Sequence, residues 1–152
     1  MTQIRQAVGA IVYHGEQFLL VHKTKINTQN GKEAIVGEWD FVKGKVEKED
    51  GNLEEAILRE LKEETGSECY KIMKSFDEKI EFVFPSEIQR KIDFQKQVTT
   101  MFLVEFKGEE EALVPIDSEI SSVRLVDKSE VVALLTHEET KRYFEKHFVG
   151  VV

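Results

Sequence analysis

The sequence predicts one domain of the α/β or α+β class, built on a mixed sheet. The order of its elements is mixed: a strand hairpin comes first, a strongly helical segment lies between strands, and helices close the chain. The 152 residues suit a single domain spanning 1–152, because domains commonly hold roughly 100 to 150 residues. The composition, 41% hydrophobic and 33% charged, indicates a packed globule rather than a disordered chain.

The first third of the chain favours strands separated by a loop. Residues 3–13 and 18–21 are rich in β-branched and apolar side chains and flank a turn at 14–16, which predicts a hairpin. The stretch 23–38 is polar and contains Asn and Gly, so we expect a long exposed loop there. Residues 39–42 are a candidate for a short strand.

A helix over residues 53–65 is the most regular element of the pattern. Asn52 stands at its N-cap with Glu55 three positions later, and Gly66 follows its last turn. We therefore expect this helix to begin at Leu53 and to end at Thr65.

The second half of the chain predicts three strands followed by two helices. Strand patterns cover residues 78–84, 95–106 and 122–126. Two pairs with capping-box spacing predict short helices over 128–135 and 137–147. These pairs are Asp127 with Glu130 and Thr136 with Glu139.

Composition also limits the class of function. Cys69 is the only cysteine, so no internal disulfide can form. No segment has the length of a membrane span or the pattern of a signal peptide, so we expect a cytoplasmic protein. The net charge of −8 argues against a broad nucleic-acid surface. An anionic substrate remains compatible with this charge if divalent cations lie between protein carboxylates and substrate phosphates.

Three acids gather on one face of the predicted helix. Spacings of three and four residues place Glu60, Glu63 and Glu64 on adjacent turns, where like charges repel by a few tenths of a kcal/mol per pair. Hard cations such as Mg²⁺ prefer carboxylate oxygens, so the pattern indicates a metal site. The alternative is an ordinary solvated helix face.

Residues near these acids favour the metal site. Ala56 falls within the same arc and leaves room for ions and phosphate. Gly44, flanked by Lys43 and Lys45, comes just before the helix, and glycine lets the backbone approach a phosphate closely.

The stretch GKVEKEDGNLEEAILRELKEETG, residues 44–66, resembles the Nudix box, G-x5-E-x7-R-E-U-x-E-E-x-G-U. Three positions depart from the family pattern: Asp50 replaces the first glutamate with one extra residue before Arg59, Ser67 replaces an apolar residue, and Val42 replaces a proline. The insertion precedes the helix cap, so it leaves the helical acids in register. The matching residues are Gly44, Arg59, Glu60, Leu61, Glu63, Glu64 and Gly66.

The resemblance implies an α/β/α sandwich with a mixed β-sheet and a hydrolase that cuts a pyrophosphate bond with Mg²⁺ or Mn²⁺. By this resemblance Glu60, Glu63, Arg59 and Glu119 are the candidate catalytic residues. Glu119 would bind metal or accept a proton, with an ordinary loop acid as the alternative. Arg59 would pair with Asp50 and fix the loop against the helix. The candidate metal-binding residues are Glu60, Glu63, Glu64 and Gly44.

Substrate choice depends on residues outside the box. Lys43, Lys45, Trp39 and Phe84 are the candidate substrate-binding residues. Trp39, Phe82 and Phe84 could stack on a base, and core packing is the alternative for each. By the resemblance, Phe84 lies near the position where family members that act on dinucleoside polyphosphates often carry a tyrosine, and this favours such a substrate. Nucleoside triphosphates and deoxynucleoside triphosphates, including oxidised ones, are the second hypothesis.

We expect a small nucleotide as the partner of this protein and no membrane. A homodimer is the assembly that we consider. A non-catalytic nucleotide sensor is the hypothesis from another class. The intact set of Arg59, Glu60, Glu63 and Glu64 argues against a sensor, because a sensor does not need the full metal cluster.

Overall fold

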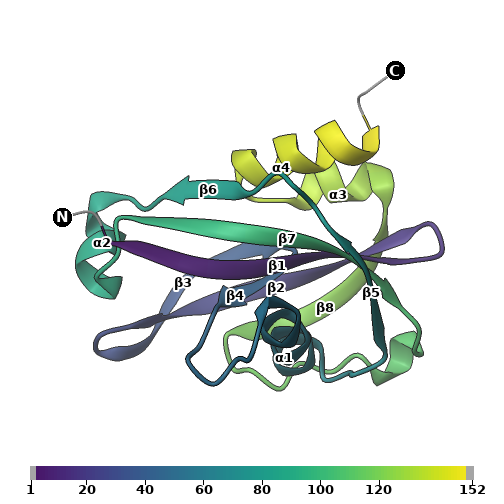
Figure 1. Cartoon of the computed structure of the whole chain (residues 1–152), viewed down its shortest axis with the longest axis horizontal. Coiled ribbons are helices and arrows are strands. Elements are labelled where there is room, and N and C mark those ends of the chain that lie inside the picture. The colour runs from purple at the N-terminus through teal and green to yellow at the C-terminus, as the bar shows by residue number, and fades with distance from the viewer. Residues whose placement is uncertain (1–2, 150–152) are drawn as a thin grey trace.

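Strands dominate the computed structural model, which describes residues 3–149 (Figure 1). The strands in the described part of the chain are β1 (Ile4–His14), β2 (Gln17–Thr28), β3 (Gly31–Asp40), β4 (Val42–Lys45), β5 (Tyr70–Ser75), β6 (Ile80–Val83), β7 (Lys96–Phe106) and β8 (Ile120–Asp127). The helices are α1 (Leu53–Thr65), α2 (Ser86–Ile92), α3 (Lys128–Leu134) and α4 (Glu138–Phe144), with short turns η1 (Glu110–Ala112) and η2 (Glu145–Val149).

The strands form one mixed, eight-stranded sheet within the described residues. Its main path is β3-β2-β1-β7-β5, while β4 pairs with β1, β6 with β7 and β8 with β2. The pair β1 and β7 is parallel, from Ile4 opposite Lys96 to Tyr13 opposite Glu105, and the neighbouring pairs are antiparallel. The mixed sheet is confirmed.

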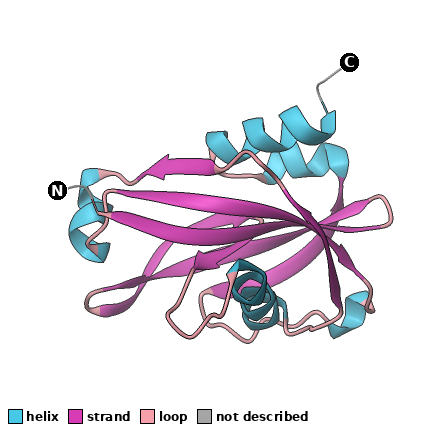
Figure 2. Ribbon diagram, viewed as in Figure 1, coloured by secondary structure: helices cyan, strands magenta, loops and turns pink. Residues whose placement is uncertain are grey.

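Helices cover both faces of this sheet, as Figure 2 shows, with α1 on one side and α3 and α4 on the other. Successive side chains of a strand point to opposite faces. Val12 of β1 therefore belongs to the core under α1, with Ile57, whereas its neighbour Ile11 belongs to the core under α4, with Phe144. The predicted α/β/α sandwich is confirmed.

Helix α1 has the predicted limits and caps. The side-chain oxygen of Asn52 accepts a hydrogen bond from the backbone N–H of Glu55 at 2.8 Å. Gly66 adopts φ 76°, a left-handed conformation that glycine accepts without steric cost, and its N–H donates to Lys62 O. These caps set the two ends of α1, and the apolar side chains Ile57 and Leu61 turn it towards the sheet.

The predicted loop over residues 23–38 is wrong, because β2 and β3 form a long antiparallel hairpin there. The turn at its tip is closed by Gly31 with φ 101°. The hairpin extends beyond the helix-covered core, so polar side chains along it meet solvent or a cavity instead of apolar neighbours. The polar side chains of these strands therefore give a sequence pattern that resembles a loop.

Three other differences are local. The candidate strand 39–42 is divided, because β3 ends at Asp40 and β4 begins at Val42. The predicted pattern omitted β5 and α2, and no residue of α2 is buried, which explains its weak signal. Helix α3 has the predicted Asp127 and Glu130 capping box, but α4 is capped at His137 rather than Thr136.

The end of the chain follows the expected helices more closely. Helix α4 continues into η2, so the helical stretch covers most of residues 137–147. Among the described residues, no helix has the length and apolar character that a membrane crossing requires.

Candidate active site

A cavity of about 480 Å³ lies where α1, the β2–β3 hairpin and β6 meet. Its size falls in the range of about 300 to 1,000 Å³ typical of small-molecule sites. One end is lined by carboxylates of α1 and by β4, and the other by apolar side chains of β6 and α2. The lining residues include Glu60, Glu63, Glu64, Phe82, Phe84 and His137.

Two acids of α1 are buried beside the core. Glu60 and Glu64 are 7% and 6% exposed, because the arc that they share lies next to the apolar face of the helix. Burial raises the pKa of Glu60. Burial, followed by repulsion from Glu60, raises the pKa of Glu64 well above its usual range. The pair of buried acids is therefore poised to gain from a bound positive charge.

Gly44 makes room for the Glu60 carboxylate. A Cβ atom at position 44 would overlap all three terminal atoms of Glu60. Gly44 pairs with Val8 in the ladder between β4 and β1, so the sheet holds its backbone against α1. Ala56 does not supply this room, as its position in the arc suggested, because it is fully buried in the core.

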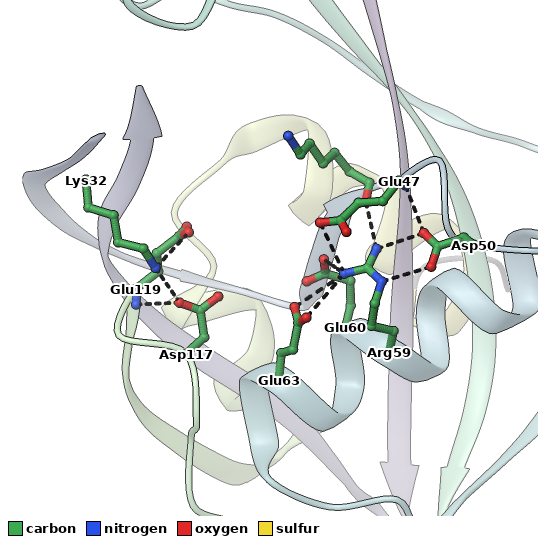
Figure 3. A network of polar contacts seen from close by, with 9 residues as sticks. Lys32, Glu47, Asp50, Arg59, Glu60, Glu63, Asp117 and Glu119 are labelled. Atoms are coloured by element: carbon green, nitrogen blue, oxygen red, sulfur yellow. Dashed lines mark hydrogen bonds and ion pairs between the residues drawn. The ribbon is translucent and has the colours of Figure 1, made fainter. Parts of the chain in front are cut away.

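Arg59 joins the acids of α1 to the preceding loop (Figure 3). Its Nε and Nη2 donate to the two carboxylate oxygens of Asp50, each at 2.9 Å, which confirms the predicted pairing. Its Nη1 lies 2.8 Å from Glu60 Oε1 and 3.3 Å from Glu63 Oε2. Hydrogen bonds from Arg59 lower the pKa of Asp50. The guanidinium thus fixes the loop and neutralises part of the acid cluster.

These residues fit a divalent cation in part. Two buried carboxylates in contact, beside a glycine that leaves space for them, give hard oxygen ligands of the kind Mg²⁺ and Mn²⁺ prefer. Among the described residues, no three Asp, Glu, His or Cys side chains already converge as a complete metal cluster. Glu63 is instead turned towards Arg59 and is 43% exposed.

Lys43 and Lys45, predicted to bind substrate, both line the cavity. Lys43 Nζ lies 3.2 Å from Asp40 Oδ1 and donates to Thr140 Oγ1 at 2.8 Å. The backbone carbonyl of Lys45 accepts a hydrogen bond from Arg59 Nη2 at 3.1 Å. Strand β4 is therefore anchored on both sides of Gly44.

Glu119 lies in the same cavity as the acids of α1, although it comes from the segment before β8. Its carboxylate is 3.4 Å from Lys32 Nζ, which also donates to Asp117 Oδ1 at 2.8 Å (Figure 3). Glu119 is also 3.9 Å from Lys23 Nζ. The hairpin β2–β3 thus brings two lysines to the edge of an acidic site.

The three aromatic residues that were candidates for stacking on a base lie in different places. Phe82 and Phe84 line the apolar end of the cavity, with their ring centroids 5.3 Å apart. Trp39 does not line the cavity: its ring packs 4.7 Å from His22, and the guanidinium of Arg124 lies 5.6 Å from its centroid. Trp39 thus lies outside the cavity lining, and its contact with substrate stays a prediction.

Arg5, Glu38 and His137 line the cavity but were not predicted from the sequence. Arg5 of β1 lies between the rings of Phe84 and Phe94, at 5.4 and 5.9 Å, and burial lowers its pKa. His137 contacts Glu38 at the start of α4. A lone Arg in a strand and a lone His at a helix start carry no sequence signal, because their partners are distant along the chain.

Comparison with known proteins places this site in a family. A family model described as the NUDIX domain matches residues 3–148. The chain belongs to the Nudix family. Nudix enzymes generally use divalent cations such as Mg²⁺ or Mn²⁺, in agreement with the acid helix.

Curated relatives are similar over much of the chain. A protein of a Nitratiruptor species named RNA pyrophosphohydrolase is 30% identical over 118 residues, which cover 71% of this chain and 74% of the relative. A protein of the same name from Campylobacter jejuni subsp. jejuni is 34% identical over 70 residues, 45% of this chain and 44% of the relative. This Nudix chain is a pyrophosphohydrolase, so the enzyme is supported over the sensor.

Solved structures show the same Nudix fold. The dihydroneopterin triphosphate pyrophosphohydrolase of E. coli has a TM-score of 0.71 at 15% identity and covers 99% of both chains. An Ap4A hydrolase of C. elegans, in a binary complex, has a TM-score of 0.64 at 16% identity and covers 97% of this chain and 99% of its own. At these identities the likeness concerns the fold alone.

Proposed function

We propose that this Nudix enzyme hydrolyses a nucleoside polyphosphate whose pyrophosphate lies at the acids of α1 and whose base lies at the apolar end of the same cavity. The observation that supports the proposal is the continuity of these two ends in one cavity. A nucleotide has the same division, with charged phosphates at one end and a flat aromatic base at the other.

At the polar end, Glu60, Glu64 and Glu63 would hold Mg²⁺ or Mn²⁺, with the backbone of Gly44 beside them. A bound divalent cation supplies positive charge that offsets the charge developing on phosphate oxygens and makes bound water more acidic. Arg59 keeps Glu60 and the preceding loop in place through its contacts with Glu60 and Asp50. Arg59 is therefore a positioning residue in this proposal.

The other polar residues would orient the phosphates and move the proton. Lys43 and Lys45 line the cavity beside Gly44, where they can contact phosphate oxygens as they enter. Glu119 would accept the proton from the attacking water, while Lys23 and Lys32 hold its carboxylate in place.

At the apolar end, Phe82 offers a ring face on which a base can stack, and stacking is worth about 1 to 3 kcal/mol per base. Phe84 is buried, at 9% exposed, and supports Phe82 from behind. Isoleucines of β6 and α2, Ile80, Ile88 and Ile92, line the same end and exclude water. This extended apolar wall favours a dinucleoside polyphosphate, which carries a second base. The 5′-triphosphate end of an RNA is the second candidate, supported by the name of the relative that is 30% identical.

The test is a substrate panel of diadenosine tetraphosphate, GTP and a short RNA with a 5′-triphosphate. We expect phosphate or nucleotide release with Mg²⁺ and none in excess chelator. Glu60→Gln should abolish most of this release, because an amide cannot replace a charged ligand. Glu68→Gln is the matched control, since Glu68 is 74% exposed and pairs with Lys62 at the surface. Equal turnover with chelator would contradict the proposal.

A further inference from the structure

Two hydrogen bonds between Trp39 and Thr136 join the end of β3 to the segment before α4. The N–H of Trp39 donates to Thr136 Oγ1 at 2.9 Å, and the N–H of Thr136 donates to the carbonyl of Trp39 at 3.1 Å. The residue before Trp39 and the residue after Thr136 are therefore held side by side. These are Glu38 and His137, whose Oε2 and Nε2 atoms are 3.0 Å apart.

This pair belongs to the cavity wall. Glu38 and His137 both line the cavity, and their side chains are 30% and 28% exposed. The His137 ring lies 5.3 Å from Phe82, at an interplanar angle of 66°. A base stacked on Phe82 would therefore lie within reach of His137.

One ring nitrogen of His137, Nε2, is engaged, and within the described residues Nδ1 makes no hydrogen bond to the protein. The Glu38 carboxylate accepts a hydrogen bond from Nε2–H. That bond raises the pKa of His137, and the protonated ring carries a second N–H at Nδ1. His137 can then donate to a ligand while Glu38 keeps the ring oriented.

The charges around His137 favour a neutral ligand group. Glu38, Asp40 and Glu139 line this part of the cavity, against Lys43 and the His137 ring itself. Lys23 also acts on Glu38, so the negative and positive side chains balance and give a phosphate no net attraction here. A neutral oxygen or nitrogen acceptor at the edge of a base needs no such attraction.

We propose that His137 is a specificity-determining residue that donates a hydrogen bond from Nδ1 to an acceptor on the edge of the substrate base, with Glu38 as its positioning residue. This proposal rests on the function proposed above and adds the group that selects the base. It also gives Trp39 a role: its backbone positions His137.

Two substitutions separate the two ring nitrogens. His137→Gln places an amide near the position of Nε2, so the contact with Glu38 survives and the donor at Nδ1 is lost. His137→Asn places an amide near Nδ1, so the donor survives and the Glu38 contact is lost. His147→Gln is the control, because His147 also pairs with a glutamate, Glu78 at 3.1 Å, but does not line the cavity.

The experiment measures dissociation constants by calorimetry at about pH 6, where the imidazolium is favoured. The probes are α,β-methylene triphosphates of adenosine, guanosine, cytidine and uridine, with inorganic tripolyphosphate as the ligand without a base. His137→Gln should weaken binding of the preferred nucleotide by roughly 10- to 100-fold and remove most discrimination among the four, because hydrogen bonds to charged groups are worth about 1.5 to 3 kcal/mol. His137→Asn should retain more of that discrimination, and tripolyphosphate binding should not change.

Several outcomes would overturn the proposal. Weaker tripolyphosphate binding in His137→Gln would assign His137 to phosphate. Equal losses in both variants, or equal losses in His147→Gln, would make its role structural. The proposal is also refuted if His137→Gln discriminates among the nucleotides as well as the parent protein does. It is refuted, too, if the parent protein binds none of the four nucleotides or binds all four equally. Nucleotide binding with normal selectivity but no hydrolysis would instead contradict the proposed function alone.

Discussion

At the scale of single residues, the acid cluster depends on a glycine. Gly44 lies so close to Glu60 that any side chain there meets its carboxylate. Its φ does not lie in the left-handed region, so the backbone itself would accept alanine. The requirement for glycine therefore comes from the Glu60 carboxylate rather than from chain geometry.

Gly44→Ala should lower hydrolysis by about 100-fold while keeping the fold, because displacement of a ligand by about 1 Å is enough for such a loss. Steady-state kinetics and a thermal melt measure both quantities. Gly15→Ala is the control: nothing lies within 4 Å of a Cβ there, but φ is 62°. That variant should lose about 1 kcal/mol of stability and keep its activity. A Gly44→Ala enzyme with normal turnover would refute this role.

Arg59→Ala should destabilise the protein by about 1.5 to 3 kcal/mol, because it leaves the Asp50 carboxylate, only 5% exposed, without its charged donor. Urea unfolding measures this change. Arg142→Ala, which removes a side chain 78% exposed and paired with Glu138 at 3.5 Å, should change stability by less than about 0.5 kcal/mol. Similar losses in the two variants would contradict the tether between Arg59 and Asp50.

At the scale of elements, distant segments meet through few polar contacts. The end of β3 and the start of α4 are joined by two hydrogen bonds between Trp39 and Thr136 and by the pair of Glu38 and His137. The pKa of Glu38 is lowered, chiefly by its hydrogen bond with His137, and the pKa of His137 is raised by the same bond. Both shifts favour the charged pair in the folded protein.

This pair predicts a window in the pH dependence of stability. The His137 contribution is complete below its ordinary pKa of 6.5 and is lost as the pH rises through its higher folded value. The Glu38 contribution is complete above its ordinary pKa of 4.5 and is lost as the pH falls through its lower folded value. The free energy of unfolding lost in Glu38→Gln should therefore be largest between these two pH values.

Urea unfolding of the parent protein and Glu38→Gln across pH 4 to 9 provides the check. Because other groups titrate in both proteins, the informative quantity is the difference between the two curves. A difference that does not vary with pH would show that the charge of this pair does not stabilise the fold.

At the scale of the whole molecule, the site lies where separate parts of the sandwich meet. Helix α1 presents acids from one layer, the β2–β3 hairpin brings lysines, and β6 with α2 closes the apolar end. The unfolded chain does not hold these groups together, so a cation bound among them stabilises only the folded state.

Mg²⁺ should therefore raise the thermal stability, by about 2.7 kcal/mol when its free concentration is 100 times its dissociation constant. Glu64→Gln should abolish most of this response. It should leave the cation-free protein at least as stable, since it removes an ionisable group whose burial beside Glu60 disfavours charge. Calorimetric melts with and without Mg²⁺ measure both effects. A full Mg²⁺ response in Glu64→Gln would remove Glu64 from the metal site.

The sequence by itself determined the parts of this protein that depend on local spacing. Caps at Asn52 and Gly66 set the limits of α1, and helical periodicity set its acids on one face beside the core. The pairing of Arg59 with Asp50 was also predictable, because the two residues are only nine positions apart. The matching residues between Gly44 and Gly66 were enough to indicate the Nudix family.

Only the tertiary structure decided the rest of the cavity. Polar strands at the β2–β3 hairpin have no apolar alternation to reveal them, because one side meets the cavity instead of the core. Arg5, Glu38 and His137 become neighbours of the acid helix or of the aromatic rings through strand pairing and helix packing across the chain. Trp39 illustrates the same reason: local sequence shows that a ring is present, but long-range packing decides which surface it covers.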